Sequence, residues 1–244
     1  MAETPDLPET LRERVDEVVA RLQRIESDHA PAALASSFGA EDMVLTDLIH
    51  RHAPGIGIFT LDTGRLNAET YALHHHVREH YGFTVETYFP RPEDVEEVVG
   101  TYGINGFYDS VDARKACCHA RKVKPLARAL EGRRAWLTGM RRAQSVTRAE
   151  LAFEEDDPVH GLRKFNPLAD WREREVWQYI RACKVPYNAL HDQGYPSIGC
   201  APCTRPVAAG EDIRAGRWWW EQPELKECGL HRMDVPVGRH RETA

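Results

Sequence analysis

Hydrophobic positions follow two alternating patterns along this chain. In residues 8–27 they return every three or four positions, as in an amphipathic helix: Leu11, Val15, Val18, Leu22 and Ile25. Residues 32–38 instead form one short apolar run closed by Gly39, which is typical of a buried strand. The same alternation predicts further elements downstream. The helices are expected at 41–49, 66–81, 92–99, around 114–124 and from 170 to 182, and the strands at 56–61, 84–89 and 134–138.

Local signals set several of these ends. Gly82 is expected to close the third helix, because glycine readily takes the left-handed conformation found there. Pro125 is expected to kink the helix around 114–124, because it lacks a backbone N–H. Asp170 and Glu173 form a D-x-x-E pair, a variant of the capping box that starts a helix.

Strands that alternate with helices predict an α/β fold with a mostly parallel, Rossmann-like sheet covered on both faces. In such sheets, ligands bind beyond the carboxyl ends of the strands. The loops 36–39, 61–64 and 139–145 fall at such ends, so we expect them to surround one pocket. Residues 150–157 are expected to form an acidic loop, and after residue 185 the periodicity disappears.

Composition narrows the function classes. The chain has 244 residues and a formal net charge of -6, which disfavours a general nucleic-acid binder. No apolar run approaches the ~20 residues of a membrane helix, and the N-terminus lacks the pattern of a signal peptide. A cytoplasmic location without membrane or nucleic-acid partners is therefore expected. There, closely spaced cysteines more often bind metals or catalyse reactions than form disulfides.

Two polar loops carry candidate binding groups for a nucleotide. Ser36, Ser37, Phe38 and Gly39 join a strand to a helix, where hydroxyls and backbone N–H groups suit a phosphate or sulfate. An ordinary turn capped by serine explains this loop equally simply. The second loop could present backbone groups to a base or ribose, or be only a turn, and consists of Leu61, Asp62, Thr63 and Gly64.

Arg141 and Arg142 place two guanidiniums at the end of the fourth predicted strand. Their planar forks match phosphate or sulfate oxyanions, although solvated surface arginines would give the same pattern.

The cysteines give the strongest chemical signal. Cys117 and Cys118 are adjacent within a basic stretch that favours thiolate, and Cys200 and Cys203 form C-x-x-C. Four thiolates can hold zinc or an iron–sulfur cluster, and adjacent cysteines suit a cluster because each can bind a different iron. Buried core thiols are the alternative. Cys228 near the C-terminus is either a mobile nucleophile or an ordinary exposed cysteine.

Seven segments, taken in order, resemble one family more specifically than any of them does alone: SSFGAED, LDTG, KACC, TGMRRAQS, IGCAPCTRPV, RAGRWWWE and KECGLH. They span residues 36–231 and are similar to those of assimilatory adenylyl-sulfate (APS) reductases, which belong to the sulfonucleotide reductases. The resemblance implies an adenine nucleotide α-hydrolase-like fold in residues 1–210 and a flexible C-terminal segment, 211–244, that carries the catalytic thiol.

The resemblance also implies residue roles. A 4Fe-4S iron–sulfur cluster would be held by Cys117, Cys118, Cys200 and Cys203. The catalytic residues would be Cys228 and the tail histidine, His231. The nucleotide would contact residues 36–39 and 61–64. The substrate anion would contact Lys122, Arg141 or Arg142, Arg214 and Arg217.

The implied reaction is reduction of adenylyl sulfate to sulfite and AMP through an S-sulfonate on Cys228, with thioredoxin or a glutaredoxin-like protein as reductant. A homo-oligomer is expected. Three alternatives stay open: reduction of 3′-phosphoadenylyl sulfate, tRNA thiolation, and a non-catalytic zinc- and nucleotide-binding module.

Overall fold

A six-stranded sheet forms the centre of the computed structural model, which describes residues 7–144, 148–208 and 210–222. The strands are β1 (Ala32–Ala35), β2 (Gly57–Leu61), β3 (Glu86–Tyr88), β4 (Ala135–Leu137), β5 (Glu154–Asp157) and β6 (Leu162–Phe165). Their order is β3-β2-β1-β4-β6-β5, and only β5 runs antiparallel to its neighbour. The mostly parallel α/β sheet predicted from the sequence is confirmed.

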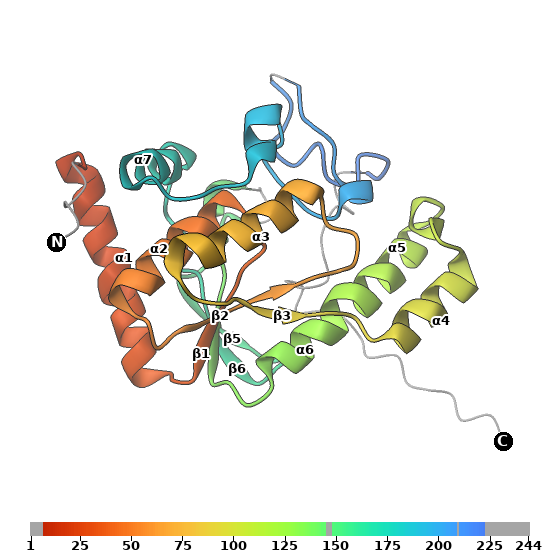
Figure 1. Ribbon diagram of the computed structural model, residues 1–244, viewed down its shortest axis with the longest axis horizontal. Coiled ribbons are helices and arrows are strands. Elements are labelled where there is room, and N and C mark those ends of the chain that lie inside the picture. The colour runs from red at the N-terminus through yellow and green to blue at the C-terminus, as the bar shows by residue number, and fades with distance from the viewer. Residues whose placement is uncertain (1–6, 145–147, 209, 223–244) are drawn as a thin grey trace.

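Helices cover both faces of this sheet (Figure 1). They are α1 (Glu9–Asp28), α2 (Ala40–His52), α3 (Ala68–Tyr81), α4 (Pro92–Tyr102), α5 (Val111–Cys118), α6 (Lys124–Leu130) and α7 (Glu173–Cys183). The larger apolar core joins α1, α2, α3 and α7 to the sheet. A smaller one joins α6 to the opposite face, where Leu126 and Leu130 pack with Phe59 and Trp136.

The sheet changes winding direction at β1. From β1 the chain steps outward to β2 and β3, then returns to place β4 on the other side of β1. The loops that follow β1 and β4 therefore diverge, which leaves a crevice above the carboxyl ends of these strands. This topology positions the candidate site.

The helix that carries the adjacent cysteines is interrupted. α5 ends at Cys118, a π-helical turn follows over His119–Val123, and α6 continues from Lys124. The Lys124 N–H bonds to the His119 carbonyl, and Pro125 has no N–H to donate. The interruption expected at Pro125 thus takes the form of a wider turn directly after the cysteine pair. Turns of this kind are often found at functional sites.

Two sequence expectations about local structure were wrong. Asp170 does not cap α7; it accepts hydrogen bonds from Arg14 (3.0 Å) and Arg21 (3.4 Å), and these guanidiniums outweigh burial to lower its pKa. The helix starts instead with Arg172, whose N–H donates to Glu175 at 2.7 Å. Gly82, in contrast, closes α3 in the left-handed conformation as predicted.

The second error concerns residues 150–157, which were expected to be a loop. Residues 154–157 form β5, paired antiparallel with β6. Strand β6 is basic where β5 is acidic: Arg163 bonds to Glu154 and Asp156, and Lys164 to Glu155. Cross-strand pairs of opposite charge stabilise a ladder that these residues would not favour by propensity.

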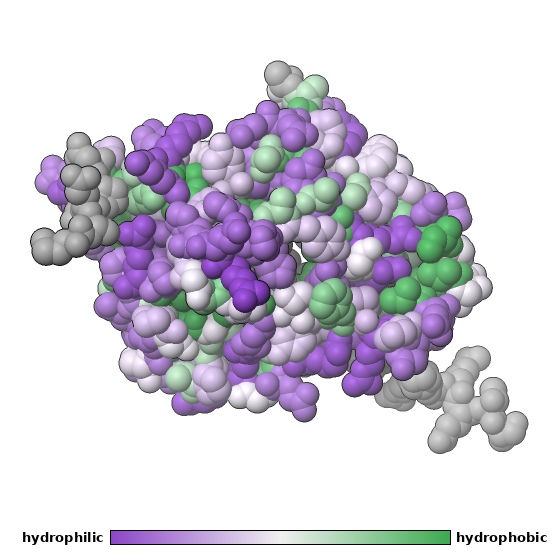
Figure 2. All heavy atoms as spheres, viewed as in Figure 1, coloured by the Kyte–Doolittle hydropathy of each residue, from purple (hydrophilic) through white to green (hydrophobic). Residues whose placement is uncertain are grey.

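The visible surface is mostly polar, with apolar side chains gathered at the end where α4 and α5 meet (Figure 2). Ile104, in the connection between them, is 61% exposed. Within the described ranges, every helix is too short or too polar to cross a bilayer.

Candidate functional site

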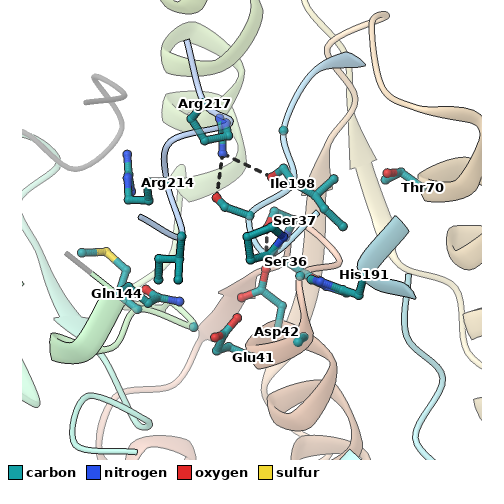
Figure 3. A pocket seen from close by; sticks show the side chains of 18 of the residues that line it. Ser36, Ser37, Glu41, Asp42, Thr70, Gln144, His191, Ile198, Arg214 and Arg217 are labelled. Carbon is teal, nitrogen blue, oxygen red and sulfur yellow. Dashed lines mark hydrogen bonds between the residues drawn. The ribbon is translucent and has the colours of Figure 1, made fainter. Parts of the chain in front are cut away.

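A cavity of about 660 Å³ opens above the carboxyl ends of β1, β2 and β4. Of the sequence-predicted binding residues, its walls include Ser36, Ser37, Gly39, Leu61, Thr63, Lys122, Arg141, Arg214 and Arg217. Figure 3 shows the serines and acidic residues on one side of this cavity and Arg214 and Arg217 on another. The three loops expected to surround one pocket do so.

The loop after β1 is tightly organised by its own hydrogen bonds. Ser36 N–H continues the sheet by donating to the Phe59 carbonyl (2.8 Å). Phe38 lies outside the cavity lining; it has φ +59° and is buried with its ring 5.0 Å from that of His74. A buried aromatic residue in the left-handed region is uncommon, and its packing holds the turn that places both serines in the cavity wall.

Asp42, at the start of α2, completes this loop. Its Oδ2 accepts hydrogen bonds from both the N–H and the hydroxyl of Ser37, each at 2.7 Å. Burial raises its pKa to about 6, although the Ser37 hydrogen bonds favour the charged form. Both Ser37 donors that the sequence offered to a phosphate therefore bond to the Asp42 carboxyl group instead, and the Phe38 N–H donates to the Ser36 hydroxyl at 3.2 Å.

The loop after β2 divides its residues between two roles. Leu61 and Thr63 line the cavity, whereas Asp62 and Gly64 do not. Asp62 is buried and its Oδ1 accepts from the Gly64 N–H and the Tyr71 hydroxyl, both at 2.8 Å. The Thr63 hydroxyl lies 3.3 Å from the Cys200 sulfur. Asp62 thus shapes the turn, and Thr63 connects the cavity to one cysteine pair.

The loop after β4 separates the two arginines. Arg141 is buried in the cavity wall, where its guanidinium pairs with Glu41 (2.7 Å) and donates to the Trp171 carbonyl (3.3 Å). Arg142 is exposed outside the cavity and donates from Nε to the Leu151 carbonyl (2.7 Å). Only Arg141 is placed to face a ligand, and Glu41 already neutralises much of its charge.

The remaining predicted cations come from other segments. Lys122 belongs to the π-helical turn, and Arg214 and Arg217 to the C-terminal stretch. Arg217 is 9% exposed and donates to Ser197 Oγ (3.4 Å) and the Ile198 carbonyl (3.3 Å) (Figure 3). It also packs on Gly199, where a Cβ would come within 2.4 Å of its guanidinium. Three cations from two distant segments thus meet at one cavity.

The cysteine pairs lie beside this cavity rather than in it. Cys117, Cys200 and Cys203 interact electrostatically with one another, and Cys118 with Arg114. Burial and the other sulfurs raise the pKa of Cys203 to about 12, against Lys122 and Arg217, and burial likewise raises the pKa of Cys117. The thiolate character expected from the basic flanks is therefore opposed by burial.

These sulfurs have the right chemistry for an iron–sulfur cluster. No disulfide joins the five cysteines within the described residues, and the two pairs share one half-buried environment. In that same part of the chain, no group of three or more His, Cys, Asp or Glu side chains has the geometry to hold a single metal ion. The donor set of two adjacent thiols and one C-x-x-C fits a cluster, whose irons can be reached separately.

One wall of the cavity was missed by sequence reasoning. It is formed by α7 and the 3-10 turn Ala189–Gln193, which contribute Trp177 and His191. The two rings meet edge to face at 5.1 Å. The chain lacks hydrophobic periodicity after residue 185, so nothing in the sequence indicated that His191 lines the same cavity as the loop after β1.

Cys228 and His231 lie outside the described residues, so their predicted catalytic roles stay predictions. Ser145, the last residue of the loop predicted at 139–145, also lies outside the described residues. The described residues 210–222 contact the same cavity as the α/β sheet, through Arg214, Arg217 and Trp218.

Comparisons with known proteins agree with this architecture. The model of the phosphoadenosine phosphosulfate reductase domain matches residues 31–206. The adenosine 5′-phosphosulfate reductase of Allochromatium vinosum is 57% identical over 226 residues, 93% of this chain and 88% of that protein. The adenosine 5′-phosphosulfate reductase of Burkholderia cepacia is 54% identical over 221 residues, 91% of this chain and 88% of its own length.

Solved structures are similar as well. The phosphoadenylyl-sulfate reductase of Candida auris, in a phosphate complex, has a TM-score of 0.65 and 28% identity, covering 83% of this chain and 98% of that one. Yeast FAD synthetase, at 13% identity and a TM-score of 0.58, covers 84% of this chain and 70% of its own and shares the fold alone. The resemblance drawn from the motifs is confirmed: the chain belongs to the phosphoadenosine phosphosulfate reductase family.

Proposed function

We propose that this chain is an oxidoreductase that reduces adenylyl sulfate to sulfite and AMP in sulfate assimilation. The observation that carries the proposal is the meeting of Lys122, Arg214 and Arg217 at the strand-end cavity. Adenylyl sulfate is an anionic nucleotide, and cations placed around its phosphate and sulfate suit both binding and departure of AMP. Relatives at 54–57% identity bear the name adenosine 5′-phosphosulfate reductase, which supports this substrate.

In the proposed first step, the Cys228 thiolate attacks the sulfur of adenylyl sulfate. An S–S bond forms, the S–O bond to the AMP phosphate breaks, and AMP leaves with the electron pair of that bond. The nearby cations lower the barrier by stabilising the negative charge that builds on the leaving phosphate. His231 is proposed to act beside the thiol.

In the second step, a dithiol protein such as thioredoxin, or a glutaredoxin-like protein, attacks the Cys228 sulfur of the S-sulfonate. Sulfite leaves, and the resulting mixed disulfide is resolved by the second thiol of the reductant. The reductant thereby gives up two electrons and becomes a disulfide, and Cys228 returns to a thiol.

The chain length limits where this thiol acts. Cys228 follows Glu221, the anchored residue nearest to it in the described part, by seven positions. At roughly 3.3–3.6 Å per residue, its Cα lies within about 25 Å of that of Glu221. We propose that this tether lets the thiol act at the cavity.

Cys117, Cys118, Cys200 and Cys203 are proposed to hold a 4Fe-4S cluster. When bound, such a cluster supplies thiolate–iron bonds that join α5 to residues 200–203 and set the electrostatic field at Lys122. The two steps above need no electrons from it, because the dithiol already supplies both.

A test of the first step uses adenylyl sulfate labelled in the sulfate group. Mixed with the purified chain in the absence of reductant, it is expected to leave label covalently on the wild-type protein but not on Cys228→Ser. Persistence of a protein-bound label in Cys228→Ser would overturn the assignment of the nucleophile. Cys183→Ser serves as the control, since that thiol lies on α7.

Reduction of 3′-phosphoadenylyl sulfate is the second candidate, because the family model and the Candida auris structure carry that substrate's name. Direct competition between the two nucleotides decides. We expect kcat/KM to favour adenylyl sulfate, and a preference for the 3′-phosphorylated form would reverse the proposal. We further propose that the protein is a cytoplasmic homo-oligomer and that residues 211–244 work as a unit distinct from residues 1–210.

A further inference from the structure

Arg114 forms a fully buried ion pair away from the cavity lining. It lies on α5, three positions before Cys117, and is 1% exposed. Its Nε and one terminal nitrogen donate to the two carboxylate oxygens of Glu221, each at 2.8 Å. The Glu221 side chain is 3% exposed. Two parallel charge-assisted hydrogen bonds fix both distance and orientation, so the C-terminal segment is held on the cysteine helix.

The same guanidinium stacks on Trp218. The Arg114 Cζ lies 4.8 Å from the indole ring centre, and the Arg217 Cζ lies 4.7 Å from it. Trp218 is 1% exposed, and its backbone N–H donates to the Cys203 carbonyl at 3.2 Å. Its φ of +41° is strained for a large side chain and persists only where the surroundings hold it. One indole therefore connects Arg114 to the anion-facing Arg217.

Arg114 also interacts with Cys118, both by charge and by hydrogen bonding. Arg114 thus contacts three residues with different predicted connections. Cys118 is a predicted cluster ligand, Trp218 packs against the predicted anion contact Arg217, and Glu221 lies near the start of the C-terminal tail. Substituting either partner of a buried pair leaves the other charge unpaired in the interior, so changes at Arg114 or Glu221 should disturb both segments.

We propose that Arg114 is a positioning residue that sets the orientation of Arg217 toward the substrate anion through Trp218 and Glu221. The proposal rests on the function proposed above. Arg114 does not line the cavity, so its effect reaches a ligand only through the residues that it holds. It should therefore matter for anionic ligands and not for the nucleoside alone.

The first test is independent of any nucleotide. Amide hydrogen exchange is measured on the ligand-free wild type, Arg114→Lys and Glu221→Gln. Lysine at position 114 keeps the positive charge but lacks the planar guanidinium that makes two parallel hydrogen bonds. Glutamine at position 221 keeps the shape of the side chain but loses its negative charge. Faster exchange is expected in peptides covering residues 203–221, because their anchoring is weakened. Arg163→Lys, an arginine in an exposed ion pair at the sheet edge, is the control.

The second test compares the Kd of adenylyl sulfate with that of adenosine for each variant. We expect the Kd of adenylyl sulfate to rise about 10- to 100-fold, the usual cost of losing one hydrogen bond to a charged group, and the Kd of adenosine to stay within about twofold. A merely structural role would lower thermal stability and leave this ratio unchanged.

The double variant Arg114→Met with Glu221→Leu covers the case in which single variants fail to fold, because apolar pairs often replace buried ion pairs without loss of stability. This double variant is expected to fold and still show a raised ratio of the Kd of adenylyl sulfate to the Kd of adenosine. A wild-type ratio of the two Kd values would overturn the proposal, whether or not exchange in residues 203–221 becomes faster. If the wild-type protein itself does not bind adenylyl sulfate, the proposed function fails, and the exchange measurement still judges the role of Arg114.

Discussion

Ser37 and Asp42 close the β1 loop on itself, because both the backbone N–H and the hydroxyl of Ser37 reach one carboxylate oxygen of Asp42 at 2.7 Å. A carboxylate thus occupies the place where this loop type offers donors to a ligand phosphate. The cations that line the cavity's other walls are Lys122, Arg214 and Arg217, and under the proposed function they supply the positive charge for the substrate anion.

Asp42 makes stability depend on pH. Its folded pKa of about 6 exceeds the ordinary 3.8, so the folded chain holds this proton more tightly than the unfolded chain does. The stabilisation is complete below about pH 4 and is lost as pH rises through about 6. The free energy of unfolding of the wild type relative to Asp42→Asn should therefore fall by about 2 kcal/mol from pH 4 to pH 7. Urea denaturation at several pH values measures it; a constant difference would contradict the raised pKa.

Gly139, directly after β4, is expected to tolerate no side chain. A Cβ there would lie 2.3 Å from Asp42 Oδ1 and 2.9 Å from the Glu41 Cβ. Gly139→Ala should lower stability by about 1–3 kcal/mol, as overpacking does, and displace the Asp42 carboxylate. Gly100→Ala, within α4 and with open space around it, should instead stabilise by roughly 0.5–1 kcal/mol. Thermal denaturation of both variants gives the comparison, and equal shifts would speak against this packing.

Lys122 and Lys124 form a natural pair for testing the anion site. Lys122 lines the cavity, while Lys124 pairs with Asp94 at the surface. Under the proposed function, Lys122→Ala should lower kcat/KM for adenylyl sulfate by about 10²–10³-fold, as loss of one donor to a developing charge does. Lys124→Ala should change it by less than about threefold, because surface ion pairs contribute little. Similar losses in the two variants would remove Lys122 from the site.

Serine substitutions at Cys203 and Cys183 distinguish the loss of a proposed cluster ligand from the loss of a thiol elsewhere in the protein. Cys203→Ser is expected to abolish the broad absorbance near ~400 nm of anaerobically purified protein, because it deletes one proposed iron ligand. Cys183→Ser, on α7, should keep it. Iron and sulfide analysis of the same samples provides the second measurement. A colourless wild type that retains zinc and full activity would eliminate the cluster.

Periodicity predicted the elements whose stability comes from one buried stripe or a continuous apolar run. Helix α1 and strands β1, β2 and β4 are of this kind, and their order along the chain places the loops around Ser36 and Thr63 at one sheet end. Strand β5 could not be found in this way. Its sequence is Glu-Glu-Asp-Asp, and it is extended only because β6 brings Arg163 and Lys164 opposite it.

The site was predicted to a similar degree. The motifs identified the cations, but the ion-pair partner of each cation depends on the fold. The sequence does not show that Arg141 pairs with Glu41 or that Arg142 lies outside the cavity. Likewise, residues around His191 carry no periodic signal, because they form a short 3-10 turn that is stabilised by tertiary contacts. The basic flanks of Cys117 suggested a lowered pKa, but burial and the neighbouring Cys200 raise the pKa of this thiol.

The acidic character of β5 has a consequence beyond pairing. This strand is the outer edge of the sheet, where unsatisfied N–H and C=O groups would otherwise invite a strand from a second molecule. Four successive carboxylates lie along that edge, and only two cations of β6, Arg163 and Lys164, pair with them, so a negative charge remains. A second copy that approached edge to edge would bring its own carboxylates against these. The acidic β5 thus disfavours the pairing of a second copy with this edge of the sheet.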